Sequence, residues 1–273
     1  MRVSLILLLA FLVASGCTRR AVEGLPPGTD VEDLPDAESW DVRLRSSADG
    51  MPTTEIEAPY LARFTTDTQY VYLGPAPGDS SSAPVDLRLY NDDGTRRGSV
   101  RALEVWLYGD GERVVAQGGA TASITGSDGA TVRAERIELE GARVEATGSV
   151  RAEVPGATVQ APRLALAEGG AFSASGGAFA RLIEAGATVR ARTVSGTGSR
   201  YTAEGGARVE TSGGRILEAG RVVWDEGAGR FQAPGAFSFD GPGERVRGVG
   251  LSATADLSRY SFRRASGQIE VRE

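Results

Sequence analysis

The sequence predicts an all-β fold built from repeated, bent antiparallel strands. Hydrophobic and polar residues alternate with a period of two over most of the chain, which is the pattern of strands, and no stretch follows a helical period. Val132, Val159, Val189 and Leu217 occupy one recurring position, at intervals of 27, 30 and 28 residues. The 37 glycines, about twice the usual share, agree with frequent tight turns.

The N-terminus has the pattern of an export signal. Arg2 precedes a twelve-residue apolar stretch from Val3 to Ala14, which is shorter than the roughly 20 residues that span a bilayer. Cys17 is the single cysteine of the chain, and it stands where a lipoprotein signal peptidase cuts. We therefore expect residues 1–16 to be a signal peptide and Cys17 to be lipidated. The alternative is an ordinary signal peptide followed by an unmodified cysteine.

Residues 17–39 are expected to be the lipidated N-terminus and a flexible linker. Leu25-Pro26-Pro27-Gly28 and several acidic residues offer little apolar surface to bury. Ordered structure is predicted to begin at Trp40 and to occupy residues 40–273. With its one cysteine used for attachment, the exported chain has no internal disulfide to form.

The composition argues against catalysis. The chain has no histidine, which removes the usual general base near neutral pH and the commonest metal ligand. The acidic pair in Asn91-Asp92-Asp93-Gly94 is typical of a turn between strands rather than of a catalytic carboxylate pair. We expect no enzyme activity, no metal and no cofactor.

Charge also excludes one class of partner. The net charge is −6, and removal of Arg2 with the signal makes it −7. All basic residues are arginines, and most of them are scattered singly. An acidic chain of this kind is not expected to bind nucleic acid.

The repeat itself has two halves. The first half is nearly identical in three copies, Gly129–Ala134, Gly156–Ala161 and Gly186–Ala191, with looser copies at Val100–Ala102 and Leu217–Ala219. The second half carries a glycine, as in Ala146-Thr147-Gly148 and Ala174-Ser175-Gly176. Each unit of about 27–32 residues is interpreted as a bent strand, a tight turn and a return strand.

A change of parity predicts where each strand bends. Val132 and Ala134 are even-numbered, whereas the next apolar pair, Ile137 and Leu139, is odd-numbered. Such a slip would turn the apolar side to solvent unless a β-bulge intervenes. Pro162 follows the equivalent alanine, where a lost ladder hydrogen bond is tolerable at a bulge or an edge. The expected fold is an open-ended roll.

The side chains predicted to face the interior of the roll are small and aliphatic. They leave either a thin core or an apolar slot that holds a lipid chain, and the residue types alone favour neither. The predicted interior positions are Val100, Ala102, Val132, Ala134, Val159, Ala161, Val189, Ala191, Leu217 and Ala219.

The repeat resembles that of the OstA-type β-jelly roll of lipopolysaccharide transport proteins. The shared pattern is Val-x-Ala, a bend, a turn, and then Ala-x-Gly-x-Val. Trp40–Leu44 followed by Ile56–Tyr60 is similar to the opening of the LptC family, and Val246–Leu251 is similar to the family's closing strands. The resemblance covers roughly residues 40–272.

The resemblance implies a role in lipid transport. It implies a periplasmic roll that takes lipopolysaccharide or a related glycolipid from an inner-membrane ABC transporter and passes it to other jelly-roll bridge proteins, towards the outer membrane. It implies an anchor in the inner membrane, whereas Thr18, after the cysteine, favours the outer membrane. The competing hypothesis is a lipid-anchored β-solenoid stalk or surface adhesin without lipid cargo.

The last strand is a candidate partner site. Gln268, Ile269, Glu270, Val271 and Arg272 form an alternating strand without proline, close to the end of the sequence. Unprotected edges of this kind invite strand addition. We expect it to pair with a neighbouring roll; the alternative is that it closes the roll on itself.

Overall fold

The computed structural model describes residues 34–65, 69–79, 83–109, 111–125 and 129–269. These residues are all-β, and they contain one short 3₁₀ turn, η2 (Glu168–Gly170), and no α-helix. Residues from Pro35 onward form one compact unit. No helix in the described ranges is long and apolar enough to cross a membrane.

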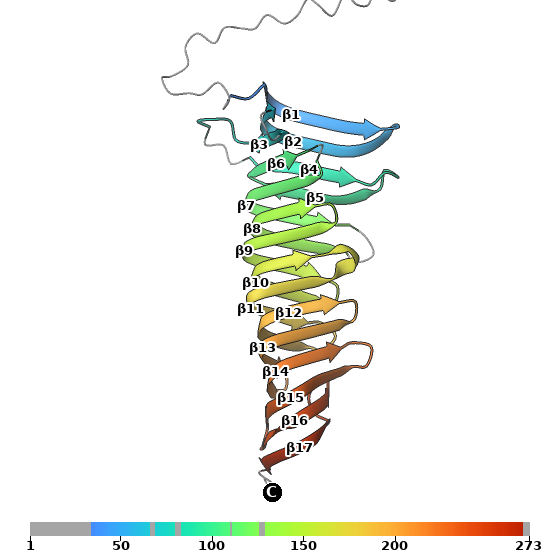
Figure 1. Cartoon of the computed structure of the whole chain (residues 1–273), viewed down its shortest axis with the longest axis vertical. Helices are drawn as coiled ribbons and strands as arrows, with labels where there is room; N and C mark the ends of the chain where they lie inside the picture. The colour runs from blue at the N-terminus through green and yellow to red at the C-terminus, as the bar shows by residue number, and fades with distance from the viewer. Residues whose placement is uncertain (1–33, 66–68, 80–82, 110, 126–128, 270–273) are drawn as a thin grey trace, which may run out of the picture. The chain divides into compact units, whose positions relative to one another are not determined.

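The described residues form seventeen strands that follow one another in sequence order (Figure 1). The N-terminal strands are β1 (Ala37–Ala48), β2 (Met51–Thr65), β3 (Gln69–Gly74), β4 (Val85–Tyr90), β5 (Arg96–Ala102), β6 (Glu104–Tyr108), β7 (Arg113–Ile124) and β8 (Ala130–Glu140). The remaining strands are β9 (Arg143–Val154), β10 (Ala157–Leu166), β11 (Phe172–Leu182), β12 (Ala187–Thr197), β13 (Arg200–Thr211), β14 (Ile216–Asp225), β15 (Arg230–Gly241), β16 (Glu244–Thr254) and β17 (Tyr260–Ile269).

The strands form one antiparallel ladder. From β7 to β17 each strand pairs with the next one along the chain. Near the N-terminus the ladder divides, because one half of β2 pairs with β3 and the other half with β4. The two branches continue through β6 and β5 and rejoin at β7. Antiparallel pairing throughout the described strands differs from the single strand direction expected of a β-solenoid.

A column of β-bulges bends the strands at their middle. The register between β8 and β9 shifts between Arg133 and Arg136, which confirms the bend predicted from the change of parity. Pro162 lies in the equivalent bulge of β10, again as predicted. We call this column the corner.

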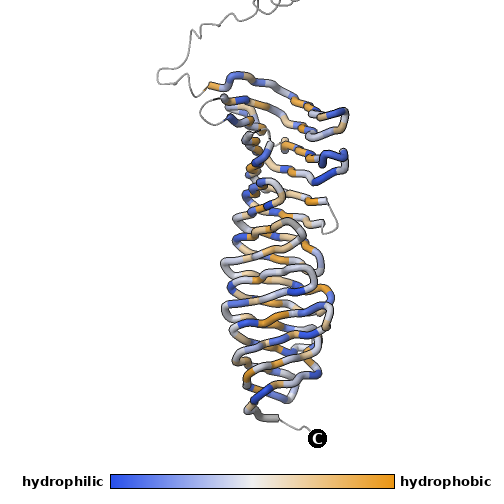
Figure 2. Tube along the Cα trace, turned by 45° about the vertical axis from the view of Figure 1, so that its right-hand side comes forward, coloured by the Kyte–Doolittle hydropathy of each residue, from blue (hydrophilic) through white to orange (hydrophobic). Residues whose placement is uncertain are grey.

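The corner divides the sheet into two layers. Layer 1 contains β4, β5, the first half of β2 and the first half of each even-numbered strand from β8 to β16, up to the corner. Layer 2 contains β3, β6 and the second half of β2 and of those even-numbered strands. The odd-numbered strands from β7 onward run from layer 2 to layer 1. Figure 2 shows the result as flattened loops stacked on one another.

The core lies between the two layers. The buried apolar side chains of the strands form one continuous cluster from Val42 to Leu257. Val132, Ala134, Ile137 and Leu139 are all buried, although the bulge separates the two pairs. One sequence repeat therefore corresponds to two bent antiparallel strands that are joined by a turn, as predicted.

Two details differ from the expectations. The first strand begins at Ala37, whereas ordered structure was expected from Trp40. The strands from β7 to β17 are 10 to 12 residues long rather than short. The reason is that a bulge bends a strand without ending the ladder, so two predicted short segments form one element.

Candidate functional site

Two hollows lie where the free ends of the two layers face each other, on the side opposite the corner. We call this boundary the seam. The N-terminal hollow is about 290 Å³, and Thr54 and Leu87 of layer 1 line it together with Val71 and Leu107 of layer 2. The central hollow is about 220 Å³. Leu89 lines both hollows, so they adjoin each other along the seam.

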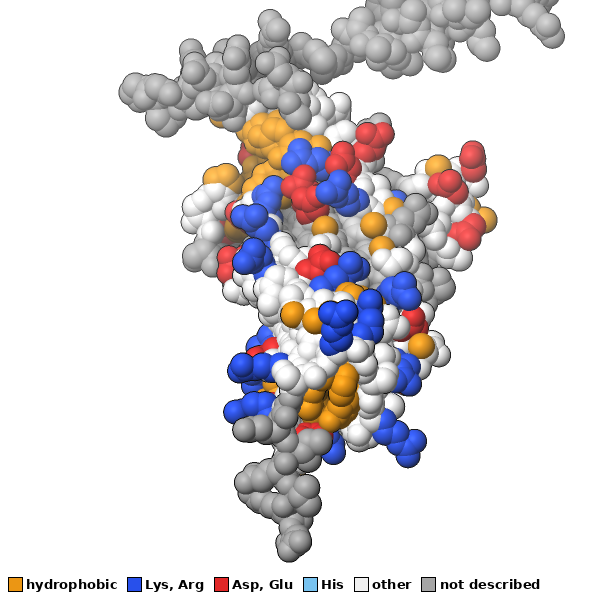
Figure 3. Space-filling view, turned by 60° about the horizontal axis from the view of Figure 1, so that its bottom comes forward, with side chains coloured by type: hydrophobic (Ala, Val, Ile, Leu, Met, Phe, Trp, Pro, Cys, Tyr) orange, Lys and Arg blue, Asp and Glu red, His pale blue; other side chains and the backbone are white. Residues whose placement is uncertain are grey.

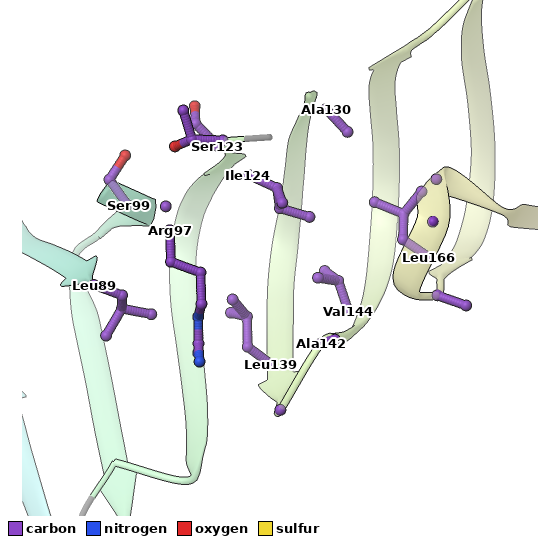
Figure 4. Close-up of a pocket in the computed structure, with 16 residues that line it drawn as sticks. Leu89, Arg97, Ser99, Ser123, Ile124, Ala130, Leu139, Ala142, Val144 and Leu166 are labelled. Carbon is purple, nitrogen blue, oxygen red and sulfur yellow. The ribbon is translucent and has the colours of Figure 1, made fainter. Parts of the chain in front are cut away.

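The central hollow is lined mainly by aliphatic side chains. Ile124 and Leu89 come from layer 1, and Leu139, Val144 and Leu166 come from layer 2. Figure 4 shows these side chains around one space, with Leu89 and Leu166 on opposite sides of it. Most of this lining is buried, and Val144 and Leu166 are each only 3% exposed.

A row of paired residues in layer 2 explains where the seam is open. Each member of this row is the cross-strand partner of the next. The row consists of Val71, Leu107, Val114, Leu139, Val144, Leu166, Phe172, Gly196, Tyr201, Trp224 and Phe231. Its first six members are aliphatic and line the two hollows, whereas from Phe172 onward it is aromatic apart from Gly196.

The aromatic part of this row fills the space between the layers. The space beside Tyr201, Trp224 and Phe231 is only about 10 Å³. The rings of Trp224 and Phe231 lie 4.6 Å apart, and those of Phe172 and Tyr201 lie 6.3 Å apart. The interior is therefore packed beside Tyr201, Trp224 and Phe231. Phe172, by contrast, lines a third and more open hollow of about 570 Å³, which shares Ala142, Leu166 and Ala167 with the central hollow.

Tyr201 also closes the seam by a hydrogen bond between the layers. Its hydroxyl, in layer 2, donates to the carbonyl oxygen of Pro155, at the free end of layer 1, at 2.7 Å. Burial raises the pKa of this hydroxyl, and the negative charge of Glu226 adds to the effect. The neighbouring Gly156 leaves room for the tyrosine, because a Cβ there would overlap its hydroxyl.

A second bridge lies at the C-terminal end of the ladder. The Tyr260 hydroxyl, in layer 2, donates to Glu244 Oε2 in layer 1 at 2.6 Å. The Tyr260 ring packs at 4.9 Å from that of Phe239, also in layer 1. By contrast, the ion pairs Arg88–Glu55 and Arg113–Glu138 near the hollows each join strands of a single layer.

The rim of the central hollow is polar on one side only. Arg97, Ser99, Ser123 and Thr125 line it from layer 1. Arg97 is the single charged residue among the described residues that line this hollow. The layer 2 side, formed by β8, β9, β10 and the following turn, offers only apolar side chains and glycine.

The predicted interior residues point inward but lie away from the hollows. Val100, Ala102, Val132, Ala134, Val159, Ala161, Val189, Ala191 and Leu217 are buried in the packed core, and Ala219 is partly buried against it. None of these ten side chains lines the N-terminal or the central hollow. Their inward orientation agrees with the predicted parity, and lipid contact at these positions stays a prediction.

The other predicted sites lie at the ends of the chain. Cys17 and Thr18 lie outside the described residues, as do Glu270, Val271 and Arg272. The prediction that the last strand begins at Gln268 was wrong, because β17 already begins at Tyr260 and Gln268 and Ile269 are its last two described residues. Their backbones pair with Arg245 and Glu244 of β16. Asp92 and Asp93 lie in a turn that is closed by a hydrogen bond from Gly94 N to Asn91 O at 2.9 Å, as expected.

Both ends of the ladder carry exposed apolar side chains. Trp40 of β1 is 61% exposed, and Phe262 of β17 and Val249 of β16 are about half exposed. Among the described strands, β1 pairs with β2 and β17 pairs with β16, which leaves one free edge on each. Figure 3 views the β17 end and shows hydrophobic side chains gathered there.

Sequence reasoning missed the residues of the hollows. Leu89, Ile124, Val144, Leu166 and Arg97 were not among the predicted interior positions. A signal was present, because the position of Val144 recurs as Phe172, Tyr201 and Phe231 in later repeats. After that change from aliphatic to aromatic residues, the seam is packed beside Tyr201, Trp224 and Phe231.

Comparison of the chain with protein-family models and with curated proteins found no match.

Proposed function

We propose that this protein is a periplasmic lipoprotein that carries or relays lipopolysaccharide or a related glycolipid, and that it is not an enzyme. In this proposal the bent sheet is an OstA-like β-jelly roll, and the acyl chains occupy the hollow part of the seam. The observation that carries the proposal is the pair of adjoining apolar hollows between the layers.

The lining of the hollows supports an acyl chain as the occupant. Ligand sites are mostly apolar, with a few placed polar groups, and the central hollow combines aliphatic side chains with one polar rim. Burying apolar surface gains roughly 25 cal/mol per Å². An alkyl chain is the ligand type that gains most from such walls.

The sequence contributes the anchor and the partners of this proposal. In the proposal, Cys17 carries the lipid anchor, and an inner-membrane ABC transporter supplies the glycolipid. The free edge of β17 receives another jelly-roll bridge protein by strand addition, through Gln268–Arg272. An open edge beside exposed apolar side chains supports such pairing.

Filling the central hollow tests the proposal. Phe172 occupies the equivalent position in the next repeat, so we expect the fold to tolerate Val144→Phe. The chain without residues 1–17 keeps all seventeen strands and the whole core, and its binding of fluorescently labelled lipopolysaccharide is measured. We expect Val144→Phe to weaken binding at least about tenfold, which corresponds to about 1.4 kcal/mol.

Val223→Phe is the matched control. Val223 lies between the buried residues Val222 and Trp224 and is itself not buried, so its side chain points away from the core. This variant should bind lipopolysaccharide like the wild type. Equal binding by wild type and Val144→Phe would remove the central hollow as the site, and absence of wild-type binding would contradict the transport role.

A further inference from the structure

We infer that the central hollow takes an amphiphile with an anionic group next to its alkyl chain, and that Arg97 binds this group. The inference rests on the proposed function, because it concerns the same hollow. Beyond the proposed function, it specifies the charge of the ligand, the side chain that binds the charged group and the orientation of the ligand in the seam.

A β-bulge gives Arg97 its position. Leu89 of β4 pairs with Gly98 of β5, whereas the next residue, Tyr90, pairs with Arg96. Arg97 is therefore the extra residue of β5, with no partner in β4. Bulges redirect side chains in this way, and Figure 4 shows the Arg97 side chain extending between Leu89 and Leu139.

The backbone around Arg97 is held in place. Its carbonyl oxygen accepts a hydrogen bond from Thr125 N at 2.8 Å. Gly98 permits this close pairing, because a Cβ there would lie 2.6 Å from the Ser123 carbonyl oxygen. The Arg97 side chain therefore extends from a backbone segment that is held in place at the rim of the hollow.

Charge favours an anion at this rim. No carboxylate is among the described side chains that line the hollow, and no ion pair of Arg97 occurs among the described residues. An arginine presents a planar fork of donors that matches phosphate or carboxylate.

The asymmetry of the rim sets the orientation. The polar groups all belong to layer 1, whereas the layer 2 side is apolar. The anionic group would lie against layer 1 at Arg97, and the alkyl chain would lie along Leu139, Val144 and Leu166. The packed aromatic residues Tyr201, Trp224 and Phe231 would limit how far the chain extends.

Decyl phosphate and decanol test this assignment, because they share a chain and differ in charge. Each is used to displace a neutral fluorescent dye from the chain without residues 1–17. We expect the wild type to bind decyl phosphate about tenfold more tightly than decanol. Arg97→Gln should remove that difference and leave decanol binding unchanged, and Arg97→Lys should keep part of it.

Arg96→Gln is the control, since Arg96 is an exposed neighbour on the same strand that does not line the hollow. It should keep the preference for decyl phosphate. Equal wild-type affinity for the two amphiphiles, or an unchanged preference in Arg97→Gln, would overturn the inference and leave the proposed function standing. Displacement by inorganic phosphate alone at similar concentrations would indicate a free-anion site and also overturn it. If neither amphiphile displaces the dye, the proposed function itself fails.

Discussion

Two neighbouring positions at the bend of a strand use glycine for different physical reasons. The first position needs a positive φ and has no room for a side chain, and the second needs only the positive φ. In β13, a Cβ at Gly205 would lie 2.6 Å from Arg192 Cβ, whereas a Cβ at Gly206 would meet nothing within 4 Å. In β9 the second position is Ser149, with a φ of 49°. A side chain is therefore tolerated there.

Substitution at these two glycines should separate the two effects. Gly206→Ser should cost about 1 kcal/mol of unfolding free energy, the penalty of a left-handed conformation. Gly205→Ala should cost about 3 kcal/mol, since overlap with Arg192 adds to that penalty. Urea denaturation of both variants measures the difference. Equal losses would contradict the role of close approach at the corner.

Two tyrosine hydroxyls join the strands across the seam in the part of the chain that the structure describes. Tyr201 of β13 bridges to the turn between β9 and β10, and Tyr260 of β17 bridges to the start of β16. Tyr201 belongs to the aromatic part of the layer 2 row, where its ring packs near that of Phe172. The Tyr260 ring packs against that of Phe239 in the other layer. Closure of the C-terminal strands therefore depends on aromatic packing together with two hydroxyl groups.

Tyr201→Phe tests this closure. The variant keeps the ring and loses the hydrogen bond to the Pro155 carbonyl, so we expect a loss of about 1 kcal/mol of unfolding free energy. Hydrogen exchange should rise at the amides of residues 156–159 and 200–204, because the two layers would separate there more often.

Tyr90→Phe provides the matched control. The Tyr90 hydroxyl donates to Glu55 Oε2 at 2.8 Å within layer 1, so its loss does not affect a contact between layers. Exchange at residues 156–159 should remain at the wild-type rate in this variant. A similar rise in both variants would show that Tyr201 has no special role at the seam.

At the scale of the whole molecule, one buried and two half-buried tyrosines make stability sensitive to alkaline pH. Burial and the hydrogen bond to Glu38 raise the pKa of Tyr60 to about 12. Burial and Glu244 raise the pKa of Tyr260 to about 12, and burial and the charge of Glu104 do the same for Tyr72. An unfolded tyrosine titrates near pH 10, so each neutral form is favoured by folding.

The direction of the pH effect follows from these shifts. Because the folded pKa values are raised, the stabilisation is fully present below about pH 10 and is lost as the pH rises towards about 12. Thermal unfolding followed at steps between these values should show a falling melting temperature. Tyr60→Phe combined with Tyr260→Phe should reduce the slope, and a melting temperature that stays constant up to pH 12 would contradict the prediction.

Much of the architecture could be predicted from the sequence. The period of two predicted strands, and the change of parity between Ala134 and Ile137 predicted the bulge, because both are local properties of a pleated chain. The repeat predicted paired, bent antiparallel strands. These features need no knowledge of which strands meet across the interior.

The seam and its hollows were decided only by the tertiary structure. Ile124 and Leu166 are far apart in the sequence, and they line one hollow because the two layers fold face to face at the corner. The series Val144, Phe172, Tyr201 and Phe231 is visible in the sequence. That this position of the repeat faces the free end of the other layer is visible only in the structure. Periodicity determines which side of a strand is buried, whereas the packing of the layers determines whether the buried space is filled.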